Sequence, residues 1–289
     1  MKKEVNGTER TVTINENKKH KDPSYVVIHE TSIGKNERFD ITGNDADIAN
    51  LERPDKPNAY EKDWRRYDTM LNESTTIGYQ ARIDFPGMFG KNEIVINMPA
   101  VCSPGQVGNV NMNPYVYGIE RCVGEEQNYH LSIANQAMLT AFVLREIGYK
   151  SSKDVQMHVF PHNFFAKNSK ACPARMLYAT YLINQAKKGK ELNNQEIEDI
   201  REFVPWQVFS ELVLEFFERN KFPQELEEKF IYDMSDYDAY VANPTGYNYS
   251  ERKKEKNHKS NDPILDSESV RLHTAEDELK YKISDEMEL

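Results

Sequence analysis

Cysteine is scarce in this sequence. Three of its 289 residues are cysteines, namely Cys102, Cys122 and Cys172. Three cysteines cannot all pair with one another, and small secreted domains that depend on disulfides carry them at much higher density, so the count argues against a disulfide framework. At least one of the three thiols must therefore be free, buried or bound to a metal.

Positive charge is also in short supply. The formal net charge at pH 7 is -10, with 37 Lys and Arg against 47 Asp and Glu. Recognition of phosphates needs clustered Lys and Arg, and the only compact basic run covers residues 252–256. We interpret that run as a solvated charge cluster in a polar stretch. The composition therefore argues against a nucleic-acid-binding protein.

Long apolar runs are missing as well. No stretch approaches the roughly 20 apolar residues that cross a bilayer, and residues 1–22 lack the apolar segment of a secretory signal. We therefore expect no membrane insertion, and synthesis in the cytoplasm without an export signal. Hydrophobic residues nevertheless make up 38% of the chain and aromatic residues 11%, which suffices for a packed core.

The composition divides the chain into four regions. Residues 1–22 are expected to form a flexible arm, residues 23–189 the folded core, and residues 190–242 an accessory region of short amphipathic helices. Residues 243–289 are polar, and we expect them to be disordered. The accessory helices have an apolar face around Trp206 that can pack on the core or on a partner.

Patterns of strands and helices alternate within the core. A β-branched run at residues 25–28 predicts a buried strand. Apolar residues at three- and four-residue steps predict a helix over residues 131–147, with Gly148 as its C-cap. Further strands are expected at residues 77–83, 93–98 and 115–123, and a further helix at 173–185. Interleaved strands and helices indicate an α/β or α+β core.

Three residues far apart in the sequence have the side chains that a catalytic zinc site requires. His29 ends the first predicted strand, His162 follows Pro161, and Cys172 precedes Pro173. Catalytic zinc usually takes three protein ligands and leaves the fourth position for water. Two histidines and one cysteine fit that count, so these three are the candidate metal ligands.

The order of five short motifs is more specific than any one of them. The motifs are Tyr-Val-Val-Ile-His-Glu-Thr at 25–31, Ile-Gly-Tyr at 77–79, Gly-Ile-Glu-Arg-Cys-Val at 118–123, Pro-His at 161–162 and Lys-Ala-Cys-Pro-Ala-Arg-Met-Leu at 170–177. Together they resemble the zinc-dependent N-acetylmuramoyl-L-alanine amidases, a family that includes phage endolysins and is related to the peptidoglycan recognition proteins. The resemblance implies an α/β fold with a mixed central sheet flanked by helices, here with a helical C-terminal extension.

The resemblance also implies a reaction and a set of residue roles. The family hydrolyses the amide between N-acetylmuramic acid and L-alanine in bacterial peptidoglycan, and zinc serves by lowering the pKa of water and polarising the carbonyl. Glu120 occupies the position of the general acid/base. Lys170 and Tyr79 occupy positions from which they would donate to the developing oxyanion.

Residues 23–189 would then be the zinc amidase catalytic domain of a phage lytic enzyme with peptidoglycan as its partner. Such an enzyme either waits in the host cytoplasm for holin-dependent release to the cell wall or travels as a component of the virion. Two alternatives stay open, a peptidoglycan-binding module that has lost catalysis and a tail-associated structural component.

The sequence departs from the family pattern near two of the motifs. Lys170 lies eight positions after His162, where family members commonly place six residues. His158 is therefore an alternative second metal ligand, although the Pro-His pair before an aromatic stretch favours His162. Gln80 replaces a histidine that often follows the tyrosine, which affects substrate contacts more than metal binding.

Overall fold

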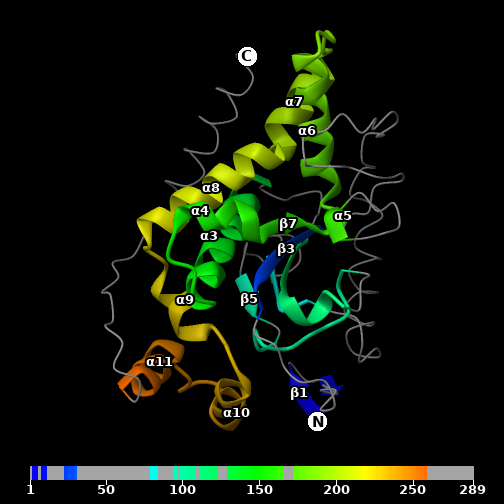
Figure 1. Ribbon diagram of the computed structural model, residues 1–289. Coiled ribbons are helices and arrows are strands. Elements are labelled where there is room, and N and C mark those ends of the chain that lie inside the picture. Colours follow the sequence, from blue (N-terminus) through cyan, green and yellow to red (C-terminus); the bar gives the residue numbers. More distant parts are fainter. Residues whose placement is uncertain are drawn as a thin grey trace.

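A mixed five-stranded sheet lies at the centre of the molecule (Figure 1). The computed structural model describes residues 2–5, 8–11, 23–30, 79–83, 94–96, 98–107, 111–122, 129–165 and 172–258. The strand order is β5-β4-β6-β3-β7. These strands are β3 (Tyr25–Glu30), β4 (Ala81–Ile83), β5 (Ile94–Ile96), β6 (Val116–Arg121) and β7 (Val159–Pro161). β3 pairs in parallel with β6 and β7, β4 pairs in parallel with β6, and β5 is antiparallel to β4.

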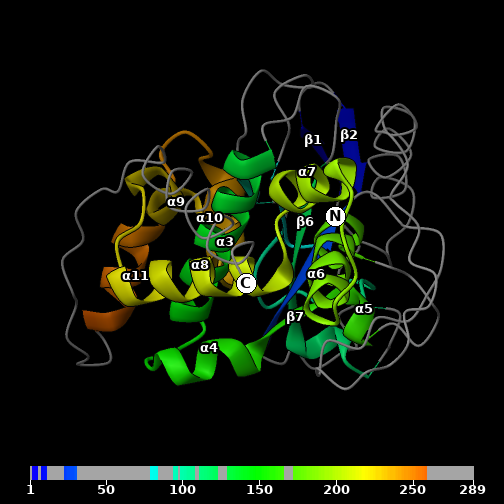
Figure 2. The same ribbon diagram turned by 90° about the horizontal axis from the view of Figure 1, so that it is seen from above.

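One face of the sheet packs on a central helix. Ile28 and Ile119 on that face belong to the same buried cluster as the apolar residues of α3 (Tyr129–Glu146). α3 is buried along most of its length because α8 (Trp206–Arg219) packs against it (Figures 1 and 2). The α/β fold with a mixed central sheet flanked by helices is therefore confirmed. Gly148, the predicted C-cap of this helix, has φ 104°, which a residue without a Cβ adopts readily.

The helices that follow the sheet share its core. Phe209 and Phe216 of α8 are buried in the same cluster as Ile28 of β3, so the accessory region packs on the core. α6 and α7 lie at the opposite end of the molecule from α10 and α11 (Figures 1 and 2). The other helices are η2 (Asn113–Tyr115), α4 (Ser152–His158), α5 (His162–Phe165), α6 (Ala174–Lys187), α7 (Asn194–Phe203), α9 (Gln224–Lys229), α10 (Met234–Ala242) and α11 (Tyr249–His258).

Within the described ranges, no helix combines the length and hydrophobicity needed to cross a membrane.

The N-terminal arm differs from its prediction. Residues 1–22 are expected to be flexible, but β1 (Lys2–Val5) and β2 (Thr8–Thr11) pair antiparallel. In the sequence, Asn6 and Gly7 stand between the two strands, and Asn-Gly is the dipeptide most typical of a two-residue hairpin turn. A lysine-rich composition concealed this local signal.

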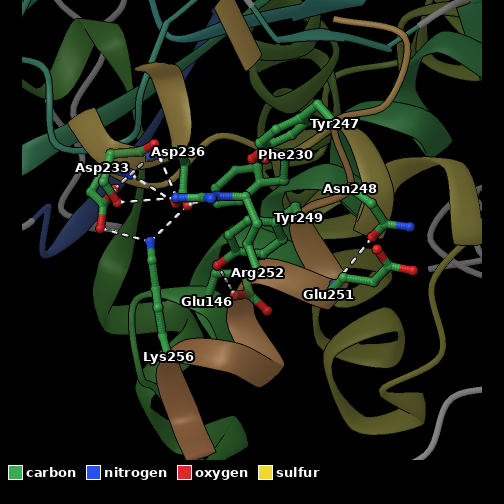
Figure 3. Close-up of polar contacts among 11 residues, drawn as sticks. Glu146, Phe230, Asp233, Asp236, Tyr247, Asn248, Tyr249, Glu251, Arg252 and Lys256 are labelled. Atoms are coloured by element: carbon green, nitrogen blue, oxygen red, sulfur yellow. Dashed lines mark hydrogen bonds and ion pairs between the residues drawn. The ribbon is translucent and has the colours of Figure 1, made fainter. Parts of the chain in front are cut away.

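The prediction of disorder from residue 243 onward is wrong for α11. This helix is anchored by its basic run, which the sequence suggested was solvated. The ion pairs reach acidic groups of α3 and α10: Arg252 Nε to Asp236 Oδ1 at 3.1 Å, Lys253 Nζ to Glu146 Oε1 at 2.6 Å, and Lys256 Nζ to Asp236 Oδ1 at 2.7 Å. Figure 3 shows Arg252 and Lys256 converging on Asp236, whose carboxylate is buried. The composition of this segment did not predict the helix, because the acidic partners of its basic residues lie elsewhere in the chain.

Candidate metal centre

The register of three parallel strands gathers the candidate residues at one edge of the sheet. His29 lies directly opposite Glu120 in the pairing of β3 with β6, and Ile28 lies opposite Pro161 in the pairing of β3 with β7. His162 follows Pro161 and so stands beside His29. The site therefore forms at the carboxyl ends of the strands, the edge where open α/β sheets bind ligands.

The three predicted metal ligands converge. One ligand atom each from His29, His162 and Cys172 lies within 4.8 Å of the other two. The imidazole rings of the two histidines are 4.5 Å apart between centroids, at an interplanar angle of 48°. His29 and Cys172 are buried, whereas His162 is half-buried. The three side chains thus form a compact cluster in which only His162 is partly exposed.

Backbone contacts join the three ligand-bearing segments. The Glu30 amide, next to His29, donates to Cys172 Sγ at 3.4 Å. The Asn163 amide, next to His162, donates to the Cys172 carbonyl at 2.9 Å. Gln136 of α3 donates from Nε2 to the His29 carbonyl at 3.1 Å. Hydrogen bonds between these segments and to α3 therefore hold the three ligand-bearing segments together.

The donor set fits zinc. His29 Nε2 is buried and has no hydrogen-bond partner within the described part of the chain, which is costly for a polar atom unless a ligand completes the site. Burial, with a smaller contribution from His162, lowers the pKa of His29, so its imidazole is held in the neutral form that binds metals. Ligand atoms around tetrahedral zinc lie roughly 3.3 to 3.7 Å apart, given bonds of about 2.0 to 2.3 Å. A small inward movement of the three side chains would reach that geometry.

Glu120 provides a buried carboxyl group on the neighbouring strand. Its side chain projects to the same face as His29, because residues paired in a parallel register share a face. Burial raises its pKa to about 8, and the nearby Glu30 adds to the rise while Arg121 opposes it. No described residue forms a hydrogen bond with its Oε1. A cation held by the three ligands would favour the ionised carboxylate and lower this pKa again.

A glutamine pair supports the strand that carries Glu120. Gly118 donates its amide to Gln80 Oε1 at 2.7 Å, and Gln106 Nε2 donates to the same Gln80 oxygen at 3.2 Å and to the Val116 carbonyl at 3.0 Å. The sequence reasoning missed Gln106. An isolated glycine within a strand was the signal, since it often marks a close approach by another group.

We predict that Gly118→Ala destabilises the protein. A Cβ at this position would lie 1.6 Å from Gln106 Oε1. The Gln106 side chain must therefore move away, and its hydrogen bonds to Gln80 and Val116 are lost. The expected loss in the free energy of unfolding is about 1 to 3 kcal/mol, measured by denaturant titration. Gln106→Ala in the same chain removes the clash, so the double variant should lose less than the sum of the two single losses. Strict additivity would contradict the proposed contact.

The structure places the remaining candidate residues, His158 and Tyr79, at different positions, and it does not describe Lys170. His158 stacks between the rings of Tyr25 at 5.4 Å and Tyr149 at 4.2 Å, and it is not part of the metal cluster, so the structure brings His162 rather than His158 to the site. Tyr79 is buried just before β4, and its role stays a prediction. Lys170 lies outside the described residues.

Neither of the other two cysteines belongs to the cluster. Cys122 is fully buried. Cys102 is half-buried, and burial raises the pKa of its thiol to about 11, which keeps it protonated at neutral pH. Both are therefore suitable controls for Cys172.

Comparison with known proteins gives structural neighbours only. No family model and no curated protein matches the sequence. Among solved structures, the catalytic domain of XlyA aligns with 21% identity and a TM-score of 0.35, over 54% of this chain and 80% of that chain. A mutant endolysin from Bacillus subtilis aligns with 21% identity and a TM-score of 0.34, over 54% and 79%. The Staphylococcus aureus hydrolase AmiA, in complex with its ligand, aligns with 17% identity and a TM-score of 0.36, over 68% and 74%. The functional assignment therefore depends on the residues of the site.

Proposed function

We propose that this chain is a peptidoglycan hydrolase, and more specifically a zinc-dependent N-acetylmuramoyl-L-alanine amidase. One observation carries the proposal: the ligand atoms of His29, His162 and Cys172 lie within 4.8 Å of one another. These residues come from three separate segments of the chain, and they are the positions at which the sequence resembles the ligand motifs of the amidase family. A buried carboxyl group on the adjacent strand completes the set that amide hydrolysis needs.

The three ligands would hold zinc, which when bound lowers the pKa of water and polarises a carbonyl group. Glu120 would take the proton of the attacking water and deliver it to the departing nitrogen of L-alanine. Such proton transfer contributes about 10²- to 10⁴-fold in rate. The burial of Glu120 limits competition from bulk solvent for that proton. Tyr79 and Lys170 are assigned as oxyanion donors from the resemblance alone.

The biological setting is also part of the proposal. Peptidoglycan is the partner, and neither nucleic acid nor a membrane is required. The protein acts as a phage lytic enzyme, held in the host cytoplasm before its release to the wall or carried on the virion. Release of new L-alanine N-termini from purified peptidoglycan is the test that separates an amidase from a binding module, which would bind fragments and release none.

We predict one zinc per chain, with Cys172 as an essential ligand. Elemental analysis should find zinc in stoichiometric amount, chelation should remove the metal and the hydrolysis together, and added zinc should restore both. Cys172→Ser removes the thiolate and should weaken zinc binding strongly. Cys102→Ser and Cys122→Ser are matched controls and should keep full zinc. A metal-free preparation with full activity, or full zinc in all three variants, would refute the assignment.

A further inference from the structure

A buried cluster of three charged residues lies directly behind the metal centre. The Glu30 carboxylate accepts hydrogen bonds from Arg121 Nη2 at 2.9 Å and from Arg175 Nη1 at 2.5 Å. The backbone amide of Arg175 also donates to Glu30 Oε2, at 3.3 Å. The exposed fraction of each of the three side chains is 1% or less. The cluster therefore contains two positive charges and one negative charge with almost no access to water.

Stability alone does not account for this cluster. Removing charges from water is costly, and apolar side chains of similar volume often replace a buried ionic cluster without loss. Among the described residues, Nε and Nη1 of Arg121 have no hydrogen-bond partner, so the pairing within the cluster is incomplete. The ring of Tyr129 lies 5.7 Å from the Arg121 guanidinium carbon and 5.8 Å from that of Arg175, which offsets part of the cost. A group of this kind is better explained by what it holds in place.

Each member of the cluster is close in sequence to a residue of the metal centre. Glu30 follows His29 on β3, and Arg121 follows Glu120 on β6. Arg175 lies in the first turn of α6, three residues after Cys172. Since neighbouring residues of a strand point to opposite faces, Glu30 and Arg121 lie behind the sheet while His29 and Glu120 face the site. The carboxylate of Glu30 thus joins β3, β6 and the start of α6.

The same residues fix the sulfur. Cys172 Sγ accepts from the Glu30 amide at 3.4 Å and donates to the Glu30 carbonyl at 3.6 Å. The Cys172 carbonyl also accepts a hydrogen bond from the Asn163 amide, at 2.9 Å. If Arg175 releases Glu30, the first turn of α6 can shift along β3, and Cys172 shifts with it.

We propose that Glu30, Arg121 and Arg175 are positioning residues that set the spacing of Cys172 from His29, and thereby the affinity and geometry of the metal site. This inference depends on the metal site of the proposed function. The three side chains contact neither metal nor substrate in this arrangement. They act through the two ligands next to them, as groups behind a metal site commonly do, with effects of about 10- to 100-fold on metal affinity.

The test compares Arg175→Met with a matched control, Arg145→Met. Arg145 also packs through its guanidinium, which lies 3.7 Å from the Phe217 ring centroid and donates from Nε to the Phe217 carbonyl at 3.2 Å, but it joins α3 to α8 away from the site. Zinc affinity is measured by chelator competition in full-length protein, and folding by circular dichroism. Arg175→Met should weaken zinc about 10- to 100-fold, whereas Arg145→Met should leave the affinity within about twofold.

The absorption spectrum of bound Co²⁺ provides a second measurement, which would not change if the three charged residues only stabilised the fold. In wild-type protein, Co²⁺ should show the absorption of a tetrahedral site with a thiolate ligand, and in Arg175→Met the thiolate contribution should be reduced. Arg175→Lys keeps the charge but loses the forked contact, so it should show an intermediate loss even if the methionine variant fails to fold. Glu30→Gln should resemble Arg175→Met in its spectrum.

The outcomes distinguish this inference from the proposed function. Folded Arg175→Lys and Glu30→Gln proteins with wild-type zinc affinity and an unchanged cobalt spectrum would overturn the positioning role and leave the zinc site standing. Wild-type protein that binds neither metal would overturn both.

Discussion

Glu120→Gln should slow hydrolysis by about 10²- to 10⁴-fold while zinc binding and fold survive. Glutamine keeps the size of the side chain but cannot accept and return the proton. The loss should appear in kcat with little change in KM, because Glu120 is assigned to the chemical step. The measurement is turnover of a soluble muropeptide together with zinc content. Normal turnover in this variant would falsify the acid/base role, and the ligand assignment would remain.

The same substitution should stabilise the metal-free protein. Folding raises the pKa of Glu120 from 4.5 to about 8, so the folded state holds this proton more tightly than the unfolded state. The neutral carboxyl group of Glu120 therefore contributes to the free energy of unfolding. This contribution is fully present below pH 4.5 and is lost as the pH rises toward 8. Glutamine does not ionise, so above that window Glu120→Gln should unfold at a Tm higher by at least about 2 °C, corresponding to roughly 1 kcal/mol. A lower Tm at every pH would contradict the buried-acid interpretation.

Truncation after Gly189 should abolish folding, because α8 forms part of the core. The truncated chain loses the apolar face of α8, whose residues Val208, Phe209, Leu212, Val213, Phe216 and Phe217 are all buried. At about 1.5 to 3 kcal/mol for each large apolar side chain, the loss is on the order of 10 kcal/mol, comparable to the whole stability of a domain. It also removes the bond from the Trp206 amide to Thr180 Oγ1, at 2.8 Å.

The control for this truncation is a chain that ends at His258, which keeps every described helix and strand. It should give the circular dichroism and cooperative unfolding of the full-length protein, whereas the shorter chain should be insoluble or unfolded. A soluble, zinc-binding chain that ends at Gly189 would show instead that residues 190–258 form a dispensable layer.

Sequence reasoning was effective where the signal is local. The β-branched run before His29 predicted β3, and the three- and four-residue steps before Gly148 predicted α3. The candidate ligands could be predicted because each lies in a short motif with a characteristic neighbouring residue, such as Pro161 before His162.

Features that depend on partners far away in the chain were missed. Glu30 lies on the face opposite His29, as the alternation of side chains along a strand requires, but nothing in the sequence indicated that Arg121 and Arg175 would meet it there. Likewise, the charges of α11 cannot be distinguished from a solvated run until Asp236 is known to lie opposite them. Such pairings follow from the fold, and no spacing along the sequence encodes them.

The order of strands in the sheet has a consequence for synthesis of the chain. Tyr25 of β3 pairs with Val116 and Val26 pairs with Val159, so the strand that carries His29 leaves the ribosome long before either neighbour exists. Cys172 and the helix that covers α3 emerge later still. Because chains are made from the N-terminus, the metal centre is assembled only after Cys172 and α8 have been synthesised. An incomplete nascent chain therefore has no assembled site with which to bind metal or attack a substrate.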